Sequence, residues 1–170
     1  YDYPNQRINL LRKYGNHPFP TEQKLEAEAC DYCYQGTISD KKIESSQQED
    51  KMNNAPEQYV VKRCSDTKYN GGWHTDLTAD GLNALRWKEL PFRSGESIIR
   101  FRYASEGEIT VCCQIGNEMT QKVTLPATGN AWEETEVAVY TRDTRGYADF
   151  NLAVIEGAIS LNYVEIITNK

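Results

Sequence analysis

The sequence has no run of about 18 apolar residues, so no segment is long enough to cross a bilayer as a helix. It also has no excess of basic residues: the 170-residue chain carries a net charge of -6 and has an isoelectric point near 5.0. Nucleic acids and anionic membranes both attract basic surfaces, so neither is expected as a partner. A chain of this length is sufficient for one domain with its own hydrophobic core.

The common catalytic motifs are missing as well. There is no G-x-S-x-G elbow, P-loop, G-x-G-x-x-G or H-E-x-x-H sequence. The two histidines, His17 and His74, have no obvious nucleophile beside them, so a Ser-His-Asp triad is not expected. Acid pairs such as Glu133 with Glu134 leave a glycosidase pair open, because the sequence does not give the separation of two carboxyl groups. We expect no enzyme here, and a small hydrolase is the weakest alternative.

The cysteines are odd in number: Cys30, Cys33, Cys64, Cys112 and Cys113. Zinc binding by Cys30-x-x-Cys33 is one interpretation, but the later cysteines lack the compact spacing of a zinc ribbon. A thioredoxin-like motif needs a βαβ context that this sequence does not have. We favour buried small residues on strands, with room for one disulfide. Adjacent strand residues face opposite ways, so at most one of Cys112 and Cys113 is expected in the core.

Alternating hydrophobic residues are the dominant pattern. The clearest alternating segments are residues 97–103, 108–115, 119–125, 135–139, 150–154 and 157–167, and shorter strands are expected at 59–63 and 83–90. Gly-containing turns separate these segments, and no long amphipathic helix is present. This spacing predicts an all-β fold, an antiparallel β-sandwich or jelly roll.

The last strand-like segment, residues 157–167, is expected to pair with the first one, residues 24–29. Such pairing would place the carboxylates of Glu26 and Glu28 near the amide of Asn162. Several oxygen donors that converge at one place suit a hard cation such as calcium.

The domain organisation follows from composition. Residues 1–23 are expected to be a linker or the end of a preceding domain, and residues 24–170 the β-sandwich. The chain begins at Tyr1 without a leader sequence, so we expect it to be a piece of a longer protein. The polar run at residues 37–57 has almost no core material and is either a mobile insertion or a wall of a binding site.

Four segments occur in a recognisable order: LEAE at residues 25–28, RFRYAS at 100–105, ATGNAW at 127–132 and SLNYVEI at 160–166. Together they resemble carbohydrate-binding modules of family 6 and of the related family 35, over about residues 24–168. The resemblance implies a galactose-binding-like jelly roll that binds polysaccharide or oligosaccharide without catalysis. It also implies covalent linkage to a glycoside hydrolase, in an extracellular, cell-surface or periplasmic location in a bacterium.

The resemblance further implies a structural calcium ion held by Glu26, Glu28 and Asn162. The family often has Asp at the third of these positions, where Asn offers a neutral carbonyl oxygen. The usual sugar cleft of the family lies in loops at one edge of the sandwich, where two aromatic rings and an Asn contact the sugar. Trp132 matches one ring, and Tyr34, with Tyr32 as its rival, matches the other.

Ser160 occupies the position of the family's sugar-binding Asn and offers one hydroxyl in place of a forked amide. This difference favours an alternative function, a structural or protein-contact sandwich that binds no sugar. Trp73, after two glycines, is a further candidate platform for a sugar ring, since an aromatic ring covers an apolar sugar face. Tyr103 and Tyr140 on strands are candidates for a concave-face site, whereas Trp87 in mid-strand is expected in the core.

Overall fold

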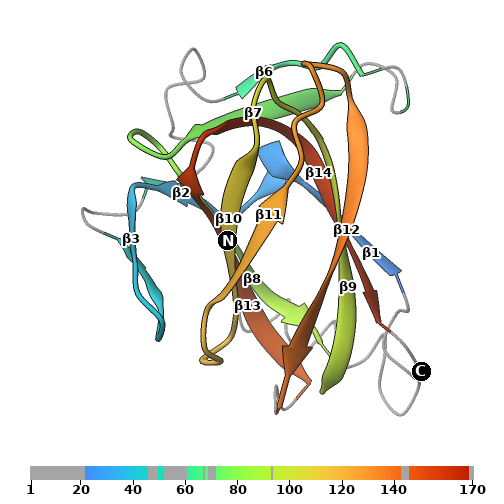
Figure 1. Ribbon diagram of the computed structural model, residues 1–170. Helices are drawn as coiled ribbons and strands as arrows, with labels where there is room; N and C mark the ends of the chain where they lie inside the picture. The colour runs from blue at the N-terminus through green and yellow to red at the C-terminus, as the bar shows by residue number, and fades with distance from the viewer. Residues whose placement is uncertain are drawn as a thin grey trace.

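The computed structural model describes residues 22–45, 50–51, 61–66, 68, 72–92, 94–142 and 146–168. Most of its strands form two antiparallel sheets that face each other (Figure 1). Sheet A has the order β12 (Glu133–Thr141), β9 (Gly95–Ala104), β14 (Ala158–Thr168), β7 (Trp73–Thr78) and β6 (Val61–Arg63), with β1 (Glu22–Glu26) also paired to β14. Sheet B has the order β11 (Gln121–Leu125), β10 (Ile109–Ile115), β13 (Tyr147–Glu156), β8 (Ala84–Pro91), β2 (Tyr32–Tyr34) and β5 (Asp50–Lys51). The predicted all-β sandwich, a jelly roll, is confirmed.

The core lies between the two sheets and is built from the alternating residues of both. Trp87 of β8 is only 3% exposed, and its ring stacks on Phe150 of β13 with 5.7 Å between ring centroids. The indole N–H of Trp87 donates to the carbonyl oxygen of Glu26, so the ring also anchors the end of β1. The prediction that Trp87 belongs to the core is confirmed.

β1 pairs with β14 in antiparallel register, with Glu22 opposite Ile167 and Glu26 opposite Tyr163. The expected pairing of the first and last strands is therefore confirmed. The expected first strand is two residues out of place, because β1 begins at Glu22 and the chain then turns into a short 3-10 helix at Ala27–Ala29. Residues 1–21 of the predicted linker lie outside the described part of the chain.

The last strand contains a β-bulge at Asn162. Leu161 pairs with Tyr103 and Tyr163 pairs with the next residue of β9, Arg102, so Asn162 has no partner in that register. An extra residue in a strand reverses which face the following side chains take. The core therefore receives Ile159 and Leu161 before the bulge and Val164 and Ile166 after it, whereas simple alternation predicted opposite faces for the two pairs.

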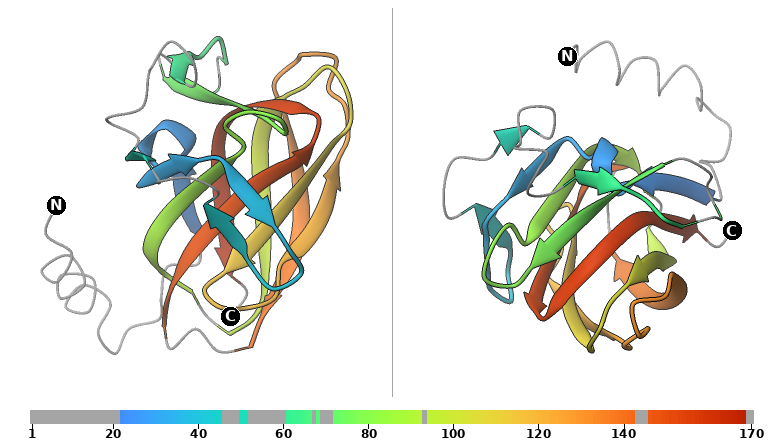
Figure 2. Two further views of the ribbon diagram at one scale, coloured as in Figure 1. Left: turned by 90° about the vertical axis from the view of Figure 1, so that its left-hand side faces the viewer. Right: turned by 90° about the horizontal axis from the view of Figure 1, so that it is seen from above.

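A hairpin of β3 (Gly36–Ile38) and β4 (Ile43–Ser45) lies beside the sandwich (Figure 2). It is the described beginning of the polar run at 37–57, and much of the remainder lies outside the described residues. The hairpin covers part of the outer face of sheet B and creates a second, small hydrophobic cluster of Tyr34, Ile43, Ala84, Cys112 and Ala153.

This cover explains why one sequence prediction is wrong. Cys112 and Cys113 do point to opposite faces, but both are fully buried, Cys113 in the main core and Cys112 under the hairpin. All five cysteines are free thiols. Burial raises the pKa of the Cys113 thiol, as expected for an inert packing residue. Within the described residues, no helix has the length and apolar character that a membrane-spanning helix needs.

Candidate functional site

A cleft of about 550 Å³ opens at the end of the sandwich where β7, the β9–β10 loop, the β11–β12 loop and the start of β14 meet. We call it the rim cleft. Its polar lining residues are Asp76, Thr78, Ser105, Glu106, Glu108, Asn130 and Ser160. Gly157 lies between them with φ of +90°, and a Cβ atom there would be 3.0 Å from the carbonyl oxygen of Glu108. A glycine at this turn keeps the wall of the cleft open.

Asp76 is the centre of a hydrogen-bond network at this cleft. Its Oδ1 accepts from the Ser160 hydroxyl at 2.7 Å and lies 3.0 Å from Nε2 of His74, and its Oδ2 lies 2.7 Å from Nζ of Lys62. Burial raises the pKa of Asp76, but hydrogen bonds from His74, Lys62 and Ser160 outweigh it and hold the pKa well below its usual range. Asp76 is therefore an ionised, fixed acceptor.

Asn130 reaches the cleft through a tight turn. Gly129 and Asn130 have φ of +62° and +63°, the left-handed conformation that a tight turn requires. The amides of Thr128 and Asn130 both donate to the carbonyl oxygen of Ser105, at 3.1 and 3.0 Å. These bonds hold the β11–β12 loop against the end of β9, so that Asn130 and Ser105 line the same cleft.

The two candidate tryptophans lie at the edge of this region. Trp132 is half-buried, packs against His74 at 5.3 Å between ring centroids, and donates from Nε1 to the hydroxyl of Ser65 at 2.9 Å. It does not line the rim cleft itself but connects to it through His74 and Asp76. Trp73, 46% exposed, precedes His74 on β7 and so faces the other side of that strand.

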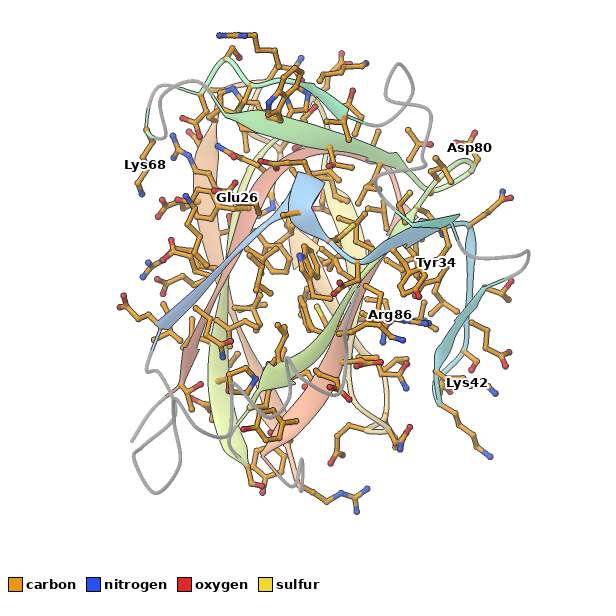
Figure 3. All side chains as sticks on the ribbon, turned by 180° about the vertical axis from the view of Figure 1, so that it is seen from behind. Glu26, Tyr34, Lys42, Lys68, Asp80 and Arg86 are labelled. Atoms are coloured by element: carbon orange, nitrogen blue, oxygen red, sulfur yellow. The ribbon has the colours of Figure 1, made fainter. Side chains whose placement is uncertain are left out.

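The structure does not bring Tyr34 to the rim cleft. Tyr34 is 2% exposed on β2 of sheet B, where its hydroxyl donates to Oδ1 of Asn151 at 3.0 Å. Figure 3 shows it beside Arg86, whose guanidinium lies 5.2 Å from the ring centroid. The β3–β4 hairpin covers this face, which removes the ring from solvent. Its rival Tyr32 is partly exposed, with Nζ of Lys88 5.2 Å from its ring centroid.

A second, polar groove of about 480 Å³ lies on the outer face of sheet B, and we call it the outer groove. Its lining includes Arg86, Glu89, Gln114, Asn117, Asp149 and Asn151. Gln114 accepts from the amide of Ile43 at 3.0 Å and donates to the carbonyl oxygen of Lys41 at 2.9 Å, which fixes the hairpin as one wall. Of the two aromatics predicted for a concave face, Tyr103 is buried in sheet A and Tyr140 is 60% exposed on β12.

A third region lies where the end of β1 pairs with β14 beside its bulge, with Glu26 opposite Tyr163, the residue after Asn162. We call Glu26, Glu28, Asn162 and Asp66 in this region the carboxylate cluster. Oε2 of Glu28 is buried and has no hydrogen-bond partner in the described part of the chain. Burial raises the pKa of Glu28 to about 7, and the negative charge of the neighbouring Glu26 adds to this effect. Glu26 itself, labelled in Figure 3, lies 2.8 Å from Nζ of Lys24.

Asn162 is oriented by Asp66, a residue that sequence reasoning did not connect with it. Nδ2 of Asn162 donates to Oδ2 of Asp66 at 2.9 Å, and its amide oxygen is the atom of this side chain that can accept. Arg102 donates to both oxygens of Asp66 at 2.7 and 2.9 Å, and this contact lowers the pKa of Asp66 to about 2. Nothing local in the sequence links residues 36 and 96 positions away from Asp66.

The carboxylate cluster fits a hard cation in one respect, since an unpartnered buried carboxylate oxygen lies beside a second carboxylate. Among the described residues no three His, Cys, Asp or Glu side chains group around one metal position. A cation here would therefore rely on the amide oxygen of Asn162 as well as on Glu26 and Glu28. The same absence, among these residues, gives no support to a zinc site at Cys30 and Cys33.

A family model described as carbohydrate binding module (family 35) matches residues 58–166, and one described as a domain of unknown function (DUF5010) matches residues 1–32. No curated protein matches. The C-terminal family 6 carbohydrate-binding module of a laminarinase from Zobellia galactanivorans matches with a TM-score of 0.60 at 19% identity, over 86% of this chain and 99% of that chain.

Two further solved structures are similar. The family 6 module of lichenase 5A from Cellvibrio mixtus, in complex with cellotriose, has a TM-score of 0.61 at 17% identity, over 87% of this chain and 98% of that one. A family 6 module from Clostridium stercorarium, in complex with cellobiose, has a TM-score of 0.57 at 16% identity, over 86% and 94%. These likenesses show the jelly-roll fold. Because the family 35 model matches more than half of the residues, the chain belongs to the carbohydrate-binding modules of family 35.

Proposed function

We propose that this chain binds oligosaccharide or polysaccharide at the rim cleft and, without catalysis of its own, targets an appended glycoside hydrolase to its substrate. The observation that carries the proposal is the cleft itself, which is lined by the hydrogen-bonding groups of Ser160, Asp76 and Asn130. A sugar offers the matching hydroxyl groups, and a pocket of several hundred cubic ångströms is large enough for at least one ring. The appended enzyme and a secreted location belong to this proposal.

The hydrogen bonds at Asp76 determine which groups of the cleft can donate to a sugar hydroxyl and which can accept from one. The hydroxyl of Ser160 donates a hydrogen bond to Asp76, so the Ser160 oxygen can accept one from a sugar hydroxyl. Asn130, exposed at the turn, has both a donor and an acceptor to offer. Trp132 lies next to this surface through its contact with His74, and its indole face is suited to cover an extended saccharide that leaves the cleft.

We also propose a structural calcium ion at the carboxylate cluster, held by Glu26, Glu28 and the amide oxygen of Asn162. Its chemistry would be neutralisation of two carboxylates that are otherwise close together and only partly solvated. The ion would connect β1 to the bulge of β14, next to the segment that carries Asp66. It would take no part in sugar chemistry and would stabilise the end of the sandwich.

One observation favours a structural or protein-contact role without sugar. The Nε1–H of Trp132 already donates to Ser65, and its ring already packs against His74, so the residue connects two loops in the absence of any ligand. A Trp132→Ala variant separates the two functions. It should lose glycan retention if the ring contacts sugar, and should lose only stability if the ring is structural.

The test of the proposal is affinity electrophoresis of the chain on a panel of plant, algal and microbial polysaccharides. Asn130→Gly removes the side chain at the rim cleft while glycine retains the positive φ, so the turn is preserved. Asn117→Gly is the matched control in the outer groove. Retention lost in Asn130→Gly and kept in Asn117→Gly supports the rim cleft; the reverse result moves the site to the outer groove, and no retention on any glycan refutes carbohydrate binding.

A further inference from the structure

The rim cleft has a negative charge that is only partly compensated. The carboxylate of Asp76 lies against Lys62, whose positive charge offsets it, and within hydrogen-bond distance of Nε2 of His74. Glu106 and Glu108, on the β9–β10 loop, are exposed and line the cleft, and neither forms an ion pair with any residue that the structure describes. No Lys or Arg is among the described residues that line it. The cleft therefore presents two carboxylates whose counter-charge has to come from a ligand or from solvent ions.

A second observation at the same place also points to a ligand. Ser105, directly before Glu106, lines the cleft and is 3% exposed, and its hydroxyl oxygen is buried with no hydrogen-bond partner among the described residues. Its main chain is fully used in holding the β11–β12 loop, through Thr128 and Asn130. A buried hydroxyl without a partner is destabilising, and a ligand that hydrogen-bonds to it removes that cost.

Among the described residues no three acidic, Cys or His side chains group around one metal position, so the rim cleft shows no ready-made set of metal ligands. Its two carboxylates suit instead a ligand whose positive charge lies on a hydrogen-bonding group. A protonated amine offers three N–H donors, which two carboxylates and a hydroxyl oxygen can accept.

We propose that the preferred ligand of the rim cleft is a cationic amino sugar, with a protonated amine directed to Glu106, Glu108 and Ser105. This inference rests on the proposed function, because it names the class of saccharide that the same cleft takes. It implies that anionic saccharides are disfavoured, since their carboxylates or sulfates would face like charge. It also implies that acetylation of the sugar amine, which removes the charge, weakens binding.

Three β-1,4-linked trimers with the same backbone provide the test: cellotriose with a 2-hydroxyl, the glucosamine trimer with a 2-ammonium group, and its fully N-acetylated form. Binding is measured by isothermal titration calorimetry at about pH 6, where a sugar amine is protonated. Two ion pairs at exposed positions should make the glucosamine trimer bind about 3- to 30-fold more tightly than cellotriose. High salt should reduce this ratio toward one, because exposed charges are screened.

The double variant Glu106→Gln/Glu108→Gln should lose this preference, which is measured as the ratio of the affinities for the glucosamine trimer and for cellotriose. The matched control is Glu22→Gln/Glu96→Gln, which removes the same charge from two exposed positions on β1 and β9 outside the cleft. Because both double variants have the same net charge, the control separates a specific contact from general attraction of a cationic trimer to an acidic protein. The control should retain the full preference.

Three results would overturn the inference, and they are distinguishable from each other. Cellotriose or another neutral glycan bound at least as tightly as the glucosamine trimer refutes the amino-sugar preference and leaves carbohydrate binding intact. Equal loss of the preference in both double variants shows a non-specific charge effect. No binding of any of the three trimers, with no retention on the polysaccharide panel, refutes the amino-sugar preference and carbohydrate binding together.

Discussion

Replacement of Glu28 by Gln should stabilise the metal-free protein and abolish its response to calcium. The carboxylate of Glu28 has opposite effects on the stability of the folded protein without and with a bound cation. The buried Oε2 has no partner in the described chain, so the ionised carboxylate destabilises the folded state when no cation is present. A bound cation would turn the same carboxylate into a stabilising ligand. An amide of the same shape removes the charge, and with it both the penalty and the metal affinity.

The size of the effect follows from the pKa of Glu28, which burial and the charge of Glu26 raise from 4.5 to about 7. This shift corresponds to at most about 3 kcal/mol against the ionised form, and partial exposure reduces the expected gain in Glu28→Gln to about 1–2 kcal/mol. Calcium at about 100 times its dissociation constant would stabilise the wild type by about 2.7 kcal/mol. For a domain of this size each 1 kcal/mol shifts the melting temperature by about 2–4 °C.

The assay is thermal and urea unfolding at about pH 8, where Glu28 is ionised, with EDTA, with calcium and with magnesium as a control cation. Glu22→Gln, an exposed residue at the start of β1, is the matched control and should behave like the wild type in all three conditions. A Glu28→Gln protein that is less stable than the wild type in EDTA, or that still gains stability from calcium, would refute the reasoning from the orphaned carboxylate oxygen.

Three further predictions test other parts of the structure. Asp66→Asn leaves Arg102 without its buried partner and should cost about 3–5 kcal/mol of unfolding free energy, measured by urea denaturation. Gly157→Ala forces a side chain into φ of +90° and against a backbone oxygen at 3.0 Å, so it should cost about 1–3 kcal/mol, whereas Gly107→Ala, with nothing within 4 Å, should not. The folded-state pKa of Asp76 is held below its ordinary value, so its contribution to stability is complete above about pH 4 and disappears at lower pH; Asp76→Asn should therefore show a flatter acid limb in unfolding experiments between about pH 5 and 2.

The overall architecture could be predicted because both of its determinants are local or repeated in the sequence. Strand positions follow from period-2 alternation, and the pairing of first and last strands follows from matching apolar faces. The bulge at Asn162 could not be predicted in this way, because an extra residue leaves the composition of the strand unchanged and shows only in the register with β9. Simple alternation therefore assigned Val164 and Ile166 to the wrong face.

The burial of Tyr34 and Cys112 was missed for a different reason. Both residues lie on the outer face of sheet B, which would be exposed in a bare two-sheet sandwich. The cover comes from Ile43, with Ile38 beside it, in a run that is otherwise strongly polar, and two apolar residues five positions apart give no period-2 signal. The long-range partners of Asp66 and Asp76 were missed because their contacts depend on strand register, which the sequence alone does not fix.

One short segment, residues 64–66, connects the carboxylate cluster to Trp132 at the edge of the rim cleft. In residues 64–66, the amide of Cys64 donates to the carbonyl oxygen of Gly72 at 2.9 Å, Ser65 accepts the indole N–H of Trp132, and Asp66 accepts from Asn162 and Arg102. Whatever displaces Asp66 therefore displaces Ser65 one residue away, and with it the only hydrogen-bond partner that the described residues provide for the indole of Trp132. A cation that connects Glu28 to Asn162 would act on the same segment. The stability of this end of the sandwich and the position of the Trp132 ring beside the rim cleft therefore depend on the same contacts.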